Sequence, residues 1–152
     1  MNKFEYIVGI DPGSNRHGVA VYNNCKLQSL HNMQAPEIID TYRYADCIFV
    51  IENVNANKGV YGRNDQQTKK AQGKVGQNVG ACKQAQVELM RWMDHYNLPY
   101  VLHKPQAGNW AEMKNKPIFE RITGWKGKSN RDNRSAAFFG YLEINACKMT
   151  GA

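Results

Sequence analysis

Two short apolar segments of the chain each end in an acidic residue, and this pattern constrains the fold more than any other feature. Residues 4–10 are largely apolar and stop at Asp11, which begins an Asp-Pro-Gly turn. Residues 47–51 are continuously apolar and stop at Glu52. Runs of this length bounded by turn residues are typical of strands, and a continuously apolar strand is typical of the buried centre of a sheet. If the two strands are neighbours, the Asp11 and Glu52 carboxylates meet.

The remaining segments predict an α/β fold. Residues 17–22 and 25–33 predict two strands that form an antiparallel ribbon with the first, and residues 99–102 predict a fifth strand. A helix after Pro36 is the crossover that makes strand 47–51 parallel to an earlier one. Apolar spacing predicts a long helix from Val75, whose apolar stripe only Gln86 interrupts, a short helical region at 110–124 and a last helix at 129–149.

This order, βββαβαβα, describes a central mixed five-stranded sheet flanked by helices. A chain of 152 residues is long enough for one domain with a sizeable core and too short for two of ordinary size. We therefore expect a single domain over residues 1–152.

A third acidic residue, Asp132, falls in the first turn of the last predicted helix. Three carboxylates are costly to hold together without cations, and hard oxygen ligands favour Mg²⁺ or Mn²⁺. Two such ions about 3.5–4 Å apart can activate water and neutralise the leaving oxygen in phosphodiester hydrolysis. Each acid also has a structural interpretation: Asp11 as a turn residue, Glu52 as the point where a strand reaches water, and Asp132 as a helix cap. None identifies a metal site by itself.

The same residues carry a resemblance to a known family. The stretch IVGIDPGSNRHGVAV, residues 7–21, resembles the first motif of RuvC-type Holliday-junction resolvases, in which the aspartate after an apolar strand is a metal ligand. FVIENV, residues 49–54, resembles the second motif, and the pattern D-x-x-S-A-A from Asp132 resembles the third, an acidic pair three residues apart on a helix. Order and spacing agree over nearly the whole chain, whose length is similar to that of the shorter phage or bacterial versions.

The resemblance implies an RNase H-like nuclease that resolves Holliday junctions and other branched DNA during recombination and repair. It implies that Asp11, Glu52 and Asp132 hold two Mg²⁺ or Mn²⁺ ions per active site. It also implies a homodimer, because a four-way junction with two-fold symmetry suits two active sites related by a two-fold axis. The helix from Val75 is a candidate seam for that dimer, and packing on its own sheet is the alternative.

The resemblance fails at one position. The family pattern usually has an aspartate as the second residue of the helical pair, whereas this chain has Ser135. Positions 132 and 135 lie on one face of a helix, so Ser135 belongs with the catalytic residues but supplies a weak, neutral ligand. Either Ser135 is a natural variation in an active nuclease, or it is an inactivating substitution in a protein that binds junctions without cutting them. Other RNase H-like nucleases, acting on flaps, forks or RNA–DNA hybrids, are a further alternative.

The formal net charge of +7 comes without a lysine block, so it is spread over a folded surface. Nucleic acid is the partner that explains this balance best, because Lys and Arg displace counterions condensed on phosphates. We expect DNA contacts from a segment after Glu52 and from a cluster around Asp132. In the segment after Glu52, the aromatic ring of Tyr61 is suited to stacking on an unpaired base. The expected contact residues are Lys58, Tyr61, Arg63, Lys69, Lys70 and Lys74 in the segment, and Lys128, Arg131 and Arg134 in the cluster. A solvated basic loop is the structural alternative.

The cysteines lack the spacing of a zinc site, and no apolar run approaches the roughly 18 residues of a membrane span. We therefore expect no structural zinc and no membrane partner. The expected location is the cytoplasm of a bacterium or a phage-infected host cell, in association with DNA.

Overall fold

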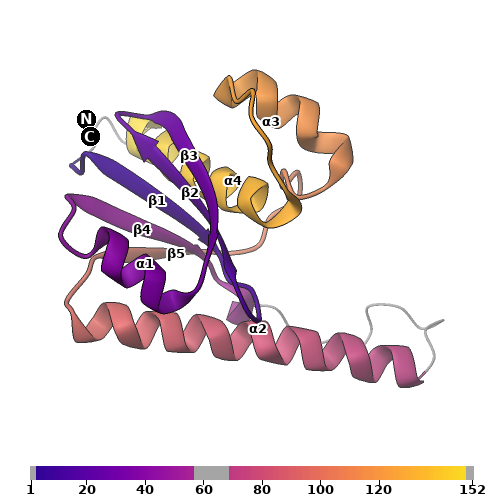
Figure 1. Ribbon diagram of the computed structural model, residues 1–152. Helices are drawn as coiled ribbons and strands as arrows, with labels where there is room; N and C mark the ends of the chain where they lie inside the picture. Colours follow the sequence, from indigo (N-terminus) through magenta and orange to yellow (C-terminus); the bar gives the residue numbers. More distant parts are fainter. Residues whose placement is uncertain (1–2, 57–68, 150–152) are drawn as a thin grey trace.

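The computed structural model describes residues 3–56 and 69–149, and within the second range it describes side chains for residues 79–148 (Figure 1). The strands are β1 (Tyr6–Asp11), β2 (His17–Asn23), β3 (Lys26–Met33), β4 (Cys47–Glu52) and β5 (Tyr100–His103). The α-helices are α1 (Ala35–Tyr42), α2 (Lys69–His95), α3 (Lys116–Thr123) and α4 (Arg131–Met149). Two single-turn 3-10 helices are η1 (Val54–Ala56) and η2 (Met113–Asn115).

The strands form one mixed five-stranded sheet in the order β3-β2-β1-β4-β5. β1, β2 and β3 pair antiparallel, whereas β4 pairs parallel with both β1 and β5. This confirms the predicted mixed sheet and the parallel placement of strand 47–51. Because Ile10 pairs with Ile51 in the β1–β4 register, the acids that follow them, Asp11 and Glu52, lie side by side at the carboxyl ends of neighbouring strands.

Helices cover both faces of the sheet, and each face has its own core (Figure 1). The face under α1 and α2 buries Val8, Ile10, Phe49, Leu89 and Met93, among others. The face under α4, to which α3 adds Phe119, buries Ile7, Ala20, Val50, Ala137 and Phe139. Alternate residues of each strand therefore enter opposite cores, as the pleat requires.

Two glycines let α4 lie directly on the sheet. A Cβ at Gly9 would collide with the backbone carbonyl of Ala136, and a Cβ at Gly18 would collide with that of Asp132. The Tyr22 hydroxyl then donates a hydrogen bond of 2.6 Å to the Ala137 carbonyl in the buried interface. The first turn of α4 is thus held against β2 by the absence of side chains at the contact.

Part of the apolar stripe of α2 packs against the sheet of its own chain. Leu89 and Met93 are fully buried in the core, and Gln86 is 1% exposed. The Gln86 amide donates 2.9 Å to Asn53 Oδ1 and accepts 3.3 Å from the Asn55 N–H, so it fixes the segment that follows β4. This part of the stripe is therefore not free to be the dimer seam, and the alternative, packing on its own sheet, is observed.

None of the helices in the described part of the chain has the length and apolarity needed to cross a membrane.

Candidate active site

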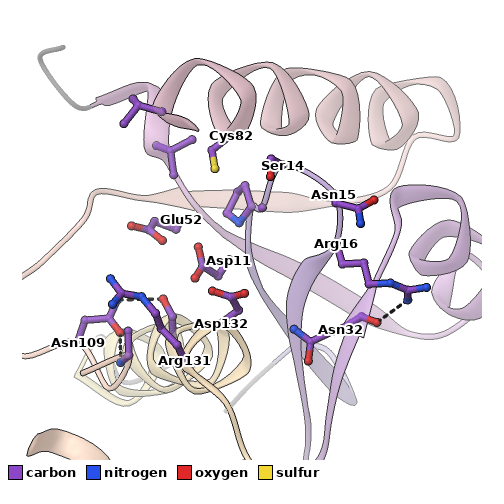
Figure 2. Close-up of a pocket in the computed structure, with 16 residues that line it drawn as sticks. Asp11, Ser14, Asn15, Arg16, Asn32, Glu52, Cys82, Asn109, Arg131 and Asp132 are labelled. Atoms are coloured by element: carbon purple, nitrogen blue, oxygen red, sulfur yellow. Dashed lines mark hydrogen bonds between the residues drawn. The ribbon is translucent and has the colours of Figure 1, made fainter. Parts of the chain in front are cut away.

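The three predicted acidic residues line a single cleft of about 720 Å³ at one edge of the sheet. Asp11 and Glu52 are the last residues of β1 and β4. Asp132 is in the first turn of α4, whose backbone lies over Gly18, and Gly18 is the residue that pairs with Asp11 across β1 and β2. Figure 2 shows the three carboxylates gathered in one part of the cleft.

Burial and mutual repulsion dominate the electrostatics of these acids. Burial, the nearby Glu52 carboxylate and, more weakly, Asp132 hold the pKa of Asp11 well above its ordinary value. Burial also raises the pKa of Glu52, while its hydrogen bond with Asp11 acts in the opposite direction. In the absence of a cation, burial and the neighbouring carboxylate therefore favour the protonated form of Asp11, and burial favours that of Glu52. A divalent cation placed between them would relieve the repulsion between the ionised forms.

The donor set suits a hard cation. No group of three His, Cys, Asp or Glu side chains in the described residues forms a ready-made metal cluster as the side chains stand. The cleft nonetheless offers oxygen donors from Asp11, Glu52 and Asp132, and the ionised forms of these carboxylates would be favoured by a bound cation. Oxygen donors of this kind fit Mg²⁺ or Mn²⁺ better than softer metals.

Ser135 also lines the cleft, where the family pattern has a fourth acid. Its Oγ accepts a hydrogen bond of 3.0 Å from Asn109 Nδ2, and the Asn109 Oδ1 accepts 2.8 Å from the Ala111 N–H, which fixes how the amide is oriented. The hydroxyl proton of Ser135 is then available to donate to Asp11, an interaction that lowers the pKa of that carboxyl. The hydrogen bond from Asn109 thus orients the Ser135 hydroxyl so that it can donate to Asp11.

Asn109 is a residue that sequence reasoning missed. It lies between β5 and η2, in no motif, and the Asn115 side chain holds its backbone carbonyl at 2.8 Å. Ser14, Asn15, Arg16, Asn32 and Cys82 also line the cleft and were not predicted. Ser14, Asn15 and Arg16 lie within the first motif, in the turn between β1 and β2, whereas Asn32 and Cys82 come from β3 and α2 and reach the cleft only in the folded chain.

His17 supports the turn that carries Asp11. Its ring is 3% exposed, and its Nδ1 accepts a hydrogen bond of 3.3 Å from the Gly13 N–H. Burial lowers the pKa of His17 to about 4, so the ring is neutral at pH 7 and can act as this acceptor. The hydrogen bond closes the Asp-Pro-Gly turn immediately after β1.

The structure describes only part of the predicted DNA-contacting set. Arg131 is exposed and lines the cleft, and Lys128 is exposed in the segment that precedes α4, where its carbonyl accepts 3.0 Å from Trp125 Nε1. Lys58, Tyr61 and Arg63 lie outside the described residues. The backbone of Lys69, Lys70 and Lys74 belongs to α2, and their side chains lie outside the described ones.

Arg134 is a correction to that set. It is 3% exposed, its Nε donates 2.9 Å to the Trp110 carbonyl, and its terminal nitrogens donate to the Ala111 carbonyl and the Ser129 hydroxyl. The prediction that Arg134 contacts DNA is therefore wrong, because the guanidinium is turned into the protein. Arg134 instead fastens the segment after β5, which carries Asn109, to α4.

Comparisons with known proteins show the fold. No family model and no curated protein matches the sequence. Among solved structures, RuvC of Thermus thermophilus in complex with a Holliday junction substrate is similar, with a TM-score of 0.58 and 14% identity, and 95% of this chain covers 96% of that one. A second structure of Thermus thermophilus RuvC has the same TM-score and coverage with 12% identity. The chain therefore has an RNase H-like fold of the RuvC type.

Proposed function

We propose that this chain, acting as one domain, is a metal-dependent endodeoxyribonuclease that resolves Holliday junctions and other branched DNA. The observation that carries the proposal is the meeting of Asp11, Glu52 and Asp132 in one open cleft. Two of these acids end parallel neighbouring strands, and the third begins the helix that crosses them. Among the described residues, none of the three acids forms an ion pair with a basic side chain, whereas a structural ion-pair network would include such pairs.

Asp11, Glu52 and Asp132 would hold two Mg²⁺ or Mn²⁺ ions. Ions bound there supply the charge that activates water and stabilises the leaving oxygen in phosphodiester hydrolysis. The chain itself places Asp11 and Glu52 at strand ends that cannot shift without breaking the sheet, and Asp132 in the first turn of α4. Ser135 adds a hydrogen bond that favours the ionised form of Asp11, the form that binds a cation. Arg131 brings a positive charge to the same cleft for the DNA backbone.

The substrate part of the proposal rests on two supports. One similar structure is a RuvC protein bound to a Holliday junction, and the present chain has a net charge of +7, which suits a polyanion. A homodimer is part of the proposal, because two cleavage sites are needed to cut a junction symmetrically. Since Gln86, Leu89 and Met93 of α2 are buried inside the chain, a dimer contact through this helix would use its other residues.

The second candidate is a junction-binding protein that does not cut, and Ser135 is the observation that favours it. A neutral residue replaces an acid there and leaves less negative charge to hold cations. Against this candidate, Ser135 is hydrogen-bonded both to Asn109 and to Asp11. The bond to Asp11 favours the ionised carboxylate, which is the form that binds a cation.

The test is incubation of the chain with labelled four-way junction, flap, RNA–DNA hybrid and linear duplex, in Mg²⁺ or Mn²⁺. The proposal expects paired symmetric nicks on the junction, loss of cutting in Asp11→Asn and Glu52→Gln, and junction binding by both variants. Equal cutting of flaps would change the assignment to a general nuclease for branched DNA. Binding without cleavage, both in the natural chain and in Ser135→Asp, would overturn the enzyme and leave the binding protein.

A further inference from the structure

A second polar group faces the cleft from the opposite side of α4. Asp11, Gly18 and Asn32 form one row across β1, β2 and β3, because Asp11 pairs with Gly18 and Gly18 pairs with Asn32. Residues in one such row point to the same face of the sheet. Two strand spacings place the Asn32 Cα about 10 Å from the Asp11 Cα. The start of α4 lies over Gly18, between them. Asn32 and Asp11 thus line the same cleft on either side of Asp132.

The orientation of the Asn32 amide is set by its neighbours. Its Oδ1 accepts two hydrogen bonds from α4 and the residue before it, 2.7 Å from Asn130 Nδ2 and 3.2 Å from Asn133 Nδ2. The Nδ2 group must then point the other way, and Figure 2 shows the Asn32 nitrogen on the side of Asp132. Among the described residues, none accepts a hydrogen bond from this nitrogen. Two fixed donor hydrogens therefore face the cleft.

Arg16 stands beside this amide. One terminal nitrogen of its guanidinium donates 3.1 Å to the backbone carbonyl of Asn32 and lies 3.5 Å from a Glu37 oxygen, and about half of the side chain is exposed (52%). Figure 2 shows this hydrogen bond to Asn32 at the edge of the cleft. Among the described residues, no other hydrogen bond occupies the remaining guanidinium nitrogens. Arg16 and Asn32 both line the cleft, so a cationic side chain and an amide with two donor hydrogens border the same part of it.

We propose that Asn32 and Arg16 bind a backbone phosphate next to the one that is cut. The proposal rests on the proposed function, since it takes the ligand to be DNA. Amide and guanidinium donors to phosphate oxygens are typical contacts that fix the register of a protein on DNA. A separation of about 10 Å is well beyond the roughly 3.5–4 Å between paired catalytic ions, so this group contacts a different phosphate from the one between Asp11 and Glu52.

The test compares two amide-to-acid substitutions on the same strand. Asn32→Asp keeps the oxygen that Asn130 and Asn133 use, replaces the donor hydrogens that face the cleft with a carboxylate oxygen, and adds a negative charge. Gln28→Glu adds the same charge at an exposed position of β3 outside the cleft. Binding of a fluorescent four-way junction is measured by anisotropy in EDTA, where no cutting occurs, and denaturant unfolding checks the fold. Asn32→Asp should weaken binding about tenfold or more, and Gln28→Glu about twofold or less.

Arg16→Gln supplies an independent result. Because Arg16 is exposed, this variant should fold, and it should reduce the slope of log affinity against log salt by about 0.9, the value for one phosphate contact. Equal binding by Asn32→Asp and Gln28→Glu, or an unchanged salt slope in Arg16→Gln, would overturn the inference while the natural chain still binds and cuts junctions. Failure of the natural chain to bind any branched DNA would instead overturn the proposed function, and this inference with it.

Discussion

The cleft is built from two regions that hold their polar groups by different means. Asp11 and Glu52 are at the ends of hydrogen-bonded parallel strands, so the ladder that builds the sheet also sets their separation. Asp132 and Ser135 come from α4, and their position depends on the missing side chain at Gly18 and on the Asn109 side chain. The strand side is therefore specified by backbone pairing, and the helix side by packing between segments far apart in the sequence. Substitutions on the two sides should fail in different ways.

The largest effect is expected on the strand side, from Asp11→Asn. Cleavage in Mg²⁺ or Mn²⁺ should fall by about 10³-fold, because a metal-binding charge worth several kcal/mol to the transition state is lost. The same variant should have a free energy of unfolding about 1 kcal/mol higher, measured by denaturant unfolding, because it removes a buried charge beside Glu52. Asp40→Asn, an exposed aspartate on α1, is the control for both measurements. A less stable Asp11→Asn would contradict the repulsion described for the site.

Gly18→Ala is expected to break the helix side without touching an acid. The added methyl group would meet the Asp132 carbonyl and push the first turn of α4 off the sheet. We expect a loss of about 1–3 kcal/mol in unfolding free energy and about 100-fold in cleavage, since a shift of about 1 Å misplaces the carboxylate.

Gly80→Ala is the matched control, because a Cβ at this exposed position of α2 meets nothing within 4 Å. It should leave cleavage unchanged and raise stability by up to about 1 kcal/mol. Equal effects of the two substitutions would show that α4 is not positioned through Gly18.

Asn109→Ala should have a smaller effect on the helix side. Loss of one hydrogen bond to Ser135 should lower the rate of cleavage about tenfold, without weakening junction binding. If Asn109 acts through Ser135, the double variant Asn109→Ala with Ser135→Ala should cut no more slowly than Ser135→Ala alone. Additive losses would mean that Asn109 has a separate role in the cleft.

The smallest effect on cleavage at neutral pH is expected from His17→Asn, which keeps an acceptor for the Gly13 N–H. Its signature is a change in stability with pH. The pKa of His17 is lowered from 6.5 to about 4 in the folded state, so the unfolded chain binds the extra proton in between, and stability falls as pH drops through this window. Unfolding at about pH 7.5 and about pH 4.5 should show that the natural chain loses about 2 kcal/mol more than the variant. Equal losses would place the pKa of His17 near its ordinary value.

Much of the strand side could be predicted because its signals are local. The apolar segments before Asp11 and Glu52 identify two buried strands, and the helical segment between them requires parallel pairing. The predicted helical region at 110–124 likewise contains α3, and the predicted start of the final helix at residue 129 lies two residues before its observed start at Arg131. Gln86 interrupts the apolar stripe of α2 in the sequence, and its hydrogen bonds to the segment after β4 explain why a polar residue is buried there.

The sequence by itself determined the strands, their terminal acids and the mixed sheet, because hydrophobic period and turn residues act over a few neighbouring positions. Only the tertiary structure decided what surrounds those acids. Ser135 is hydrogen-bonded to Asp11 and Asn109, Arg134 turns inward, and Asn32 meets residues about a hundred positions away. Such contacts depend on how α4 lies over glycines of the sheet, and a polar side chain takes whichever partner that packing provides.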